Sequence, residues 1–164
     1  MATLAIVQCG ARKIWRKHPN AGPTRAKDAY ASGYFQNNRA YAERFGKRWL
    51  ILSAKYGFLE PETRIRDYDV SFLDPRTHPI GIGKLRTQVR LKRLARYRDV
   101  VVLGGSAYVE IVRRAFTGTA VKIHQPFRGL RGIGFIQQAV KRAVLRGRMD
   151  LRRSWRSPSK HEDS

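Results

Sequence analysis

The sequence predicts an α/β fold: a single-domain three-layer sandwich with a mostly parallel four-stranded sheet and a basic C-terminal tail. Three observations lead to this prediction. Four short apolar runs have the length of buried strands, at residues 3–8, 49–52, 99–103 and 121–123. Segments with helical spacing of apolar residues separate these runs, and such alternation is typical of a parallel sheet covered on both faces. A chain of 164 residues is also long enough to bury one core without disulfides or metals.

The first strand, residues 3–8, is followed by a predicted loop at 14–23, which contains two prolines and a glycine. Thr24 is suited to cap a helix that begins at Arg25. Apolar residues recur at helical spacing from there to Gly46, a natural helix stop. We expect a break at Ser32-Gly33 to divide this region into two helices.

The segment after the strand at 49–52 changes character twice. Residues 61–74 are predicted to be irregular and contain the acidic island Asp67-Tyr68-Asp69. A helix is then predicted over 84–97, and it carries cations with no acid among them. Because these cations lack Glu partners one turn away, the helix repels itself, which favours an external anion.

The last third of the chain contains two predicted strands and two predicted helices. The strand at 99–103 ends in Gly104-Gly105, and Ser106 is suited to cap a helix over 107–116. This order of strand, glycine turn and helix start is typical of a phosphate or carboxylate cradle, although it lacks P-loop spacing. After the strand at 121–123 comes a glycine-rich basic loop and a helix over 135–145. We expect residues 1–148 to form the domain and 149–164 a disordered basic tail.

Charge is the strongest compositional signal. Thirty-four Lys and Arg against 12 Asp and Glu give a formal net charge of +22. A domain with this imbalance repels itself unless a polyanion screens it, so nucleic acid, DNA rather than RNA, is the expected partner. No membrane partner is expected, because no segment approaches the roughly 20 apolar residues of a membrane span. We expect a monomer.

Cys9 is the single cysteine, so neither an intramolecular disulfide nor a cysteine-based zinc site is expected. Because the sequence has a single cysteine and no disulfide is expected, we expect a reducing cytoplasmic location. The four histidines show no ligand spacing, so we expect no metal and no cofactor.

The ends of the four predicted strands carry residues suited to ligand binding. They are Cys9-Gly10, Ser53-Ala54-Lys55-Tyr56, Gly104-Gly105 and His124. In open α/β sheets ligands bind outside the carboxyl ends of the strands. We therefore expect these segments to line one positively charged hollow.

Four motifs carry a family resemblance: Cys9-Gly10-x-x-Lys13, the segment 26–30, the segment 51–57 followed by Tyr68-Asp69, and Leu103-Gly104-Gly105-x-x-Tyr108. Together they resemble a family of uncharacterised bacterial and phage domains over most of residues 4–137. That family is distantly similar to the peroxide-stress protein YaaA, whose members bind DNA. A weaker resemblance is to the uracil-DNA-glycosylase architecture, from which the chain departs by the Gln between His124 and Pro126.

The glycosylase resemblance implies extrusion of a base, stacking on it and stabilisation of the departing charge. Residues assigned to catalysis on this hypothesis are His124, Asp67, Asp69, Lys55 and Cys9. Residues assigned to substrate binding are Gly10, Lys13, Ser53, Tyr56, Phe58, Gly104, Gly105 and Tyr108. Nucleic-acid contacts are assigned to Arg12, Arg90, Arg93, Arg128, Arg131, Arg152 and Arg153.

Each assignment has an alternative. Lys13 and Lys55 are suited to contact phosphates, or to attack the sugar as amines if their pKa values are depressed by burial. Tyr30 and Tyr68 fit core positions with bonded hydroxyls. Cys9 fits a small buried hydrophobe as well as half of a thiol–imidazole pair with His124.

Three function classes remain. The first is an enzyme acting on nucleic acid, a DNA glycosylase-like hydrolase that releases a modified or damaged base. The second is a non-catalytic DNA-binding protein similar to YaaA. The third, and weakest, is an enzyme acting on free nucleotides, for which a net charge of +22 would be excessive.

Overall fold

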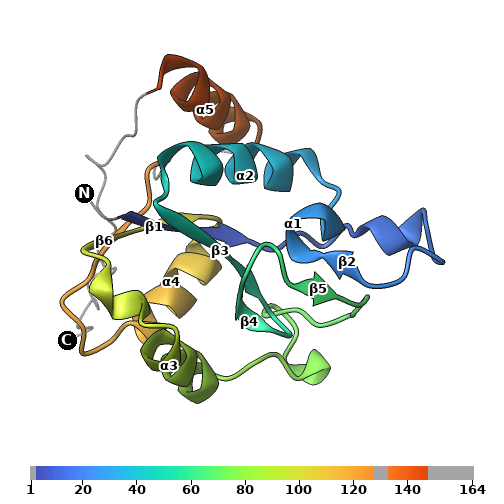
Figure 1. The fold of residues 1–164 in the computed structure, drawn as a ribbon, viewed down its shortest axis with the longest axis horizontal. Helices are drawn as coiled ribbons and strands as arrows, with labels where there is room; N and C mark the ends of the chain where they lie inside the picture. Colours follow the sequence, from blue (N-terminus) through green and yellow to red (C-terminus); the bar gives the residue numbers. More distant parts are fainter. Residues whose placement is uncertain (1–2, 128–132, 148–164) are drawn as a thin grey trace, which may run out of the picture.

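The computed structural model describes residues 3–127 and 133–147, which form a single α/β domain of three layers (Figure 1). The central sheet has the order β4-β3-β1-β6-β7. Its strands are β1 (Thr3–Gln8), β3 (Arg48–Ser53), β4 (Gly57–Leu59), β6 (Asp99–Leu103) and β7 (Lys122–His124). Four of these strands run parallel, and β4 pairs antiparallel with β3.

The prediction of a four-stranded, mostly parallel sheet is wrong, because the sheet is mixed and has five strands. Residues 57–59, for which no strand was predicted, form the edge strand β4. Gly57 adopts a left-handed φ of 75°, which lets the chain reverse tightly after β3. Ser53 then pairs with Gly57, and Leu52 with Phe58.

The core sits at the centre of the sheet. All five residues of β6 are buried, as are the first five of β1. Their Val, Leu and Ile side chains, with those of β3, face helices on both sides. Full burial of each such side chain contributes about 1.5–3 kcal/mol, which explains why the apolar runs in the sequence located these strands.

One face of the sheet is covered by α2 (Gly33–Phe45), and α5 (Ile133–Arg146) packs on α2 (Figure 1). The predicted break at Ser32-Gly33 is confirmed, because a separate short helix, α1 (Ala26–Ala29), precedes α2. The Ser32 hydroxyl caps α2 by accepting the Phe35 N–H at 3.2 Å. Thr24 does not cap α1. It pairs instead within a two-stranded sheet of β2 (Thr24–Arg25) and β5 (Arg64–Ile65).

The opposite face is covered by α3 (Ile82–Leu91) and α4 (Ser106–Ala115) (Figure 1). The helix predicted over 84–97 is wrong at its end. Arg93 adopts a left-handed φ of 54°, which ends the helical run and leads into the short 3-10 turn Leu94–Arg96. Ser106 is the first residue of α4 and makes no cap hydrogen bond.

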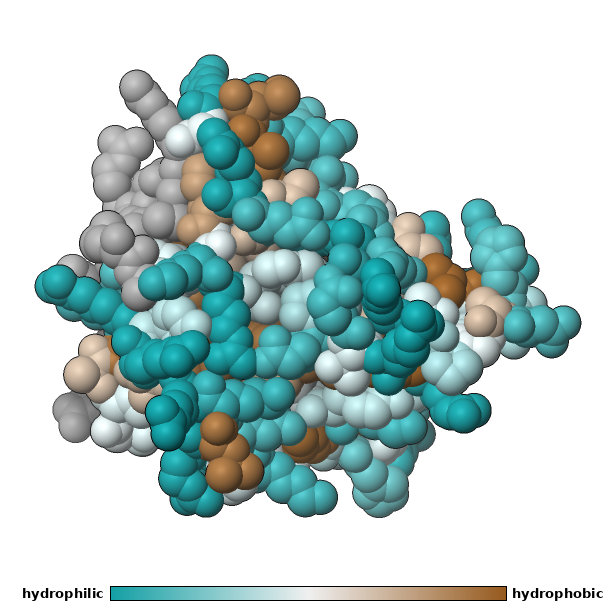
Figure 2. All heavy atoms as spheres, in the orientation of Figure 1, coloured by the Kyte–Doolittle hydropathy of each residue, from teal (hydrophilic) through white to brown (hydrophobic). Residues whose placement is uncertain are grey.

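The visible surface is mostly hydrophilic, and its apolar residues lie in small separate patches (Figure 2). Within the ranges described, no helix has the length and apolarity needed to cross a bilayer. The predicted tail at 149–164 lies outside the described residues.

Candidate functional site

Five side chains from separate segments meet beyond the carboxyl ends of β1 and β3. We refer to Cys9, Tyr30, Ser53, Tyr68 and Tyr108 as the strand-end cluster. Cys9 directly follows β1, and Ser53 is the last residue of β3. Tyr30 follows α1, Tyr68 follows β5, and Tyr108 lies in the first turn of α4. The fold therefore brings together residues up to 99 positions apart.

Ser53 organises the turn that follows β3. Its hydroxyl oxygen accepts the backbone N–H groups of Lys55 at 3.2 Å and Tyr56 at 3.1 Å. The same hydroxyl donates to the Tyr68 hydroxyl at 3.0 Å. A small hydroxyl residue at the end of a buried strand is thus required both for the turn and for the cluster.

The three tyrosines of the cluster are buried phenols. The hydroxyls of Tyr30 and Tyr68 lie 2.7 Å apart, and that of Tyr108 lies 3.5 Å from the Cys9 sulfur. Burial raises the pKa of all three, and the proximity of Cys9 raises each pKa further. At neutral pH these groups therefore keep their protons and act as hydrogen-bond donors rather than as bases.

Two lysines and Tyr56 border the cluster. The Lys13 ammonium lies 4.3 Å from the centre of the Tyr68 ring, within cation–π range. The Tyr56 ring meets the Tyr68 ring edge-on, with centroids 5.5 Å apart. The exposed Lys55 ammonium lies 5.2 Å from the Tyr56 ring. Positive charge thus borders the cluster on its Lys13 and Lys55 sides.

Gln88 of α3 fixes the turn that carries Lys55 and Tyr56. Its side-chain nitrogen donates to the Tyr56 carbonyl at 3.0 Å, and its oxygen accepts the Phe58 N–H at 2.8 Å. A Cβ at Gly57 would lie 2.3 Å from that oxygen, so only glycine fits beneath the amide. Sequence reasoning missed Gln88, because a polar residue on a basic helix carries no signal of a contact 30 residues away.

A cavity of about 450 Å³ opens beside the cluster. We call it the loop pocket, and it is lined by Arg12, Lys13, Ile14, Arg16, Lys17, His18 and Ala31. Its wall is held in place by buried Trp15, whose indole N–H donates to the Gly22 carbonyl at 2.9 Å. Lys13 belongs to both sites, since it lines the pocket and lies over Tyr68. Figure 1 shows this segment, in blue, reaching outward beyond α1 and β2.

The comparisons with known proteins cover the residues of both the cluster and the loop pocket. The family of unknown function DUF6884 matches residues 4–141, which include the whole cluster and the loop pocket. The chain belongs to this family. It is also 39% identical over 145 residues to the uncharacterized protein YfjM of Bacillus subtilis (strain 168), covering 88% of this chain and 96% of that protein. No solved structure matches the chain. The similarities to YaaA and to the glycosylase architecture are not shown and stay hypotheses.

In this DUF6884 member the start of α4 is not a free anion cradle. The Gln8 side-chain oxygen accepts the Gly105 N–H at 2.8 Å, where an anion would otherwise bind. A Cβ at Gly104 would lie 2.8 Å from the Gln8 Cβ, so glycine is needed for close packing there. The cavity beside Gly104 measures about 20 Å³, which is room for about one water molecule.

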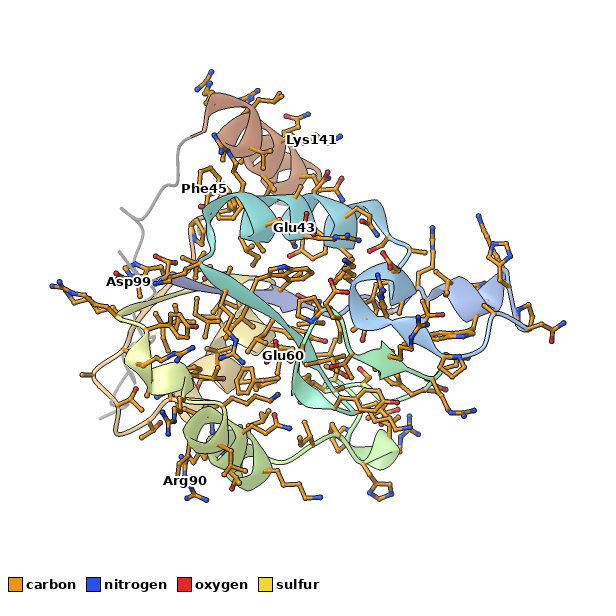
Figure 3. All side chains as sticks on the ribbon, in the orientation of Figure 1. Glu43, Phe45, Glu60, Arg90, Asp99 and Lys141 are labelled. Carbon is orange, nitrogen blue, oxygen red and sulfur yellow. The ribbon has the colours of Figure 1, made fainter. Side chains whose placement is uncertain are left out.

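His124 does not join the strand-end cluster. Its Nε2 lies 2.8 Å from Asp99 Oδ1, and both side chains are buried. Asp99 is the first residue of β6, at the opposite end of that strand from the cluster (Figure 3). Strands β3 and β7 are also three positions apart in the sheet, roughly 14 Å at the usual strand spacing. The expected single hollow lined by four strand ends, and the expected pairing of His124 with Cys9, are therefore not found.

The other predicted site residues divide between the two sites and the surface. Phe58 is 1% exposed and packs edge-on against Phe116, so it offers no face for a base. Asp67 and Asp69 are exposed, and Asp67 accepts the Tyr68 N–H at 2.9 Å. Gly10, half-buried, follows Cys9 next to Ser32.

The predicted nucleic-acid contacts lie in three places. Arg12 lines the loop pocket. Arg90 and Arg93 are exposed, and Arg90 points outward from α3 (Figure 3). Outside the described residues lie Arg128, Arg131, Arg152 and Arg153. Across the described ranges, no three His, Cys, Asp or Glu side chains gather as metal ligands would.

Proposed function

We propose that the chain binds nucleic acid, DNA in preference to RNA, and that the loop pocket receives a phosphate-bearing group of it. The observation that carries the proposal is the pocket itself. Four of its seven lining residues are Lys or Arg, and none of the four forms a salt bridge with another described residue. A volume of about 450 Å³ is in the range of small-ligand sites.

The charge balance of the described residues supports a polyanionic partner. Every described acidic side chain except Asp67 and Asp69 pairs with a basic side chain. Apart from Asp67 and Asp69, the described acids that could neutralise the remaining cations are thus already engaged. A second unneutralised group lies on and just after α3, and consists of Lys84, Arg86, Arg90 and Arg93. Phosphates supply the missing negative charge, at an affinity that falls steeply with salt.

Binding is tested by fluorescence anisotropy with single-stranded and duplex DNA and RNA at several salt concentrations. Each lost phosphate contact should reduce the slope of log affinity against log salt by about 0.7–0.9. We expect this reduction for Lys17→Ala in the loop pocket. Lys122→Ala is the matched control, because Lys122 is an exposed lysine on the far edge strand β7 that forms no salt bridge with another described residue. Equal effects of the two substitutions would contradict the assignment of the pocket.

A second candidate function is hydrolysis of an N-glycosidic bond, and one observation favours it. Lys13 lines the loop pocket, and its amine lies 4.3 Å from the centre of the ring of Tyr68, a member of the cluster. An enzyme of this class must hold an extruded nucleotide and stabilise its departing base. The test is incubation with DNAs that carry diverse modified bases, followed by mass spectrometry for released bases and alkaline cleavage of abasic products. We place either activity in the reducing cytoplasm, where Cys9 stays a free thiol.

A further inference from the structure

Two lysines outside the loop pocket extend its positive charge toward α3, and the first of them is Lys55. The Lys13 ammonium lies 4.3 Å from the centre of the Tyr68 ring, and the Tyr68 and Tyr56 ring centroids lie 5.5 Å apart. The Lys55 ammonium lies 5.2 Å from the centre of the Tyr56 ring. These three lengths put the Lys13 and Lys55 ammonium groups at most about 15 Å apart, which spans about four phosphates of one strand at roughly 3.4 Å each.

The second lysine is Lys84, and two contacts bring its part of α3 to the turn that carries Lys55. The Ile80 N–H, two residues before α3 begins, donates to the Ala54 carbonyl at 2.8 Å. Gln88 holds the same turn from within α3 by two hydrogen bonds. Because Lys84 lies four residues before Gln88, the two side chains share one side of the helix. Lys84 therefore borders the turn that carries Lys55.

This region keeps an excess of positive charge. Lys55 and Lys84 are exposed, and neither forms a salt bridge with another described residue. Asp67 and Asp69, which flank Tyr68 in the chain, are also exposed and outside the salt bridges of the described residues. With the four cations of the loop pocket, six cations stand against these two acids. The balance favours an anionic ligand that is larger than the pocket.

We propose that one strand of nucleic acid runs from the loop pocket along Lys13, Lys55 and Lys84, which we call the lysine path. This rests on the proposed function and identifies its ligand as an oligonucleotide rather than a free nucleotide. A mononucleotide in the loop pocket cannot extend over a distance of several phosphates. In a longer strand, further phosphates meet further lysines and release counterions. Proteins that bind a strand without regard to its sequence use such a row of cations along the backbone.

The test is isothermal titration calorimetry with thymidine 5′-monophosphate, with oligothymidylates of up to about 12 nucleotides, and with a duplex of the greatest length. Wild-type affinity should rise with the length of the strand until the lysine path is filled. Lys55→Ala and Lys84→Ala should each leave the affinity for the mononucleotide unchanged. Each should lower the affinity for the longest strand by about 2- to 10-fold and reduce its salt slope by about 0.7, as expected for one lost phosphate contact. Lys17→Ala, in the loop pocket, should weaken mononucleotide and strand alike.

Two further variants serve as controls. Lys122→Ala removes an exposed lysine on the far edge strand β7, so it should change neither affinity. Lys84→Arg keeps a positive charge at the same position of α3 and should keep the full gain in affinity with length. Loss of that gain in Lys84→Ala but not in Lys84→Arg would show that the charge, rather than the packing of the helix, is required.

The outcomes separate the two proposals. If the mononucleotide, the single strands and the duplex all fail to bind, the proposed function fails and this inference falls with it. If strands bind and depend on Lys17, but Lys55→Ala and Lys84→Ala bind the longest strand as tightly as wild type, the inference alone is overturned. An equal loss for Lys122→Ala and Lys84→Ala would also overturn it, because the loss would then report net charge rather than a path.

Discussion

Substitution of Ser53 by alanine tests whether the strand-end cluster is held together as described. Ser53 is 0% exposed and makes three hydrogen bonds, two to the turn after β3 and one to Tyr68. A typical intramolecular hydrogen bond contributes about 1 kcal/mol net, so Ser53→Ala should cost about 3 kcal/mol. In a chain of this size that corresponds to a fall of roughly 6–12 °C in the thermal midpoint.

The assay is urea unfolding followed by circular dichroism, in which the midpoint should fall while the slope stays unchanged. Ser106→Ala is the matched control. Ser106 is exposed at the start of α4 and makes no cap hydrogen bond, so its loss should cost less than about 0.5 kcal/mol. The account of the turn would be refuted if Ser53→Ala cost no more than Ser106→Ala.

Three further predictions concern neighbouring features. Gly57→Ala should lower the free energy of unfolding, measured in urea, by at least about 1 kcal/mol more than Gly118→Ala. Both glycines have a left-handed φ, but of the two only Gly57 faces a side chain that a Cβ would meet. Burial raises the pKa of Tyr108, so above pH 10 the unfolded chain should lose the Tyr108 proton that the folded protein keeps. The free energy of unfolding of the wild type should therefore fall by about 1.4 kcal/mol per pH unit more than that of Tyr108→Phe. Parallel curves of stability against pH for the two proteins would contradict this. Gln8→Ala should open the N-terminus of α4 to anions, so sulfate should raise its thermal midpoint more than that of wild type.

The sequence predicted the parts of the fold that depend on local apolar pattern. The runs at 3–8 and 99–103 are strands because their side chains are buried on both faces, and a continuous apolar run records this directly. The edge strand β4 was missed because three residues are too few to show a period of two. It forms because of the turn at Gly57 and the contact with Gln88, and both depend on tertiary structure.

The candidate site was also predicted only in part, because residues at strand ends can be read from the sequence whereas contacts between distant segments cannot. Cys9 and Ser53 were found because strand ends can be read from the sequence, and Tyr108 because it follows a glycine turn. Tyr30 and Tyr68 were interpreted as core residues with bonded hydroxyls. They are bonded to each other, but they are 38 positions apart, so this pairing becomes visible only in the structure.

His124 shows how a strand that ends one residue later than predicted changes a functional hypothesis. The sequence predicted a strand ending at residue 123, which would leave His124 in a loop at the sheet edge. The strand β7 includes His124 as its last residue and pairs it with Val101 of β6. Asp99 lies two residues before Val101 and therefore shares its face of the sheet, so His124 meets Asp99 on that face.

The strand order explains why the candidate site lies around β1. The connection after β1 leads to β3 on one side and the connection after β6 leads to β7 on the other, so the connections diverge between β1 and β6, which is where α/β sheets bind ligands. On the β6 side Gln8 already occupies the N–H group that an anion would use. On the β3 side the chain carries Lys13 and Lys55, with the loop pocket beside them. The side of β1 suited to accept a ligand is therefore the side that faces β3, where unneutralised charge and the loop pocket lie together.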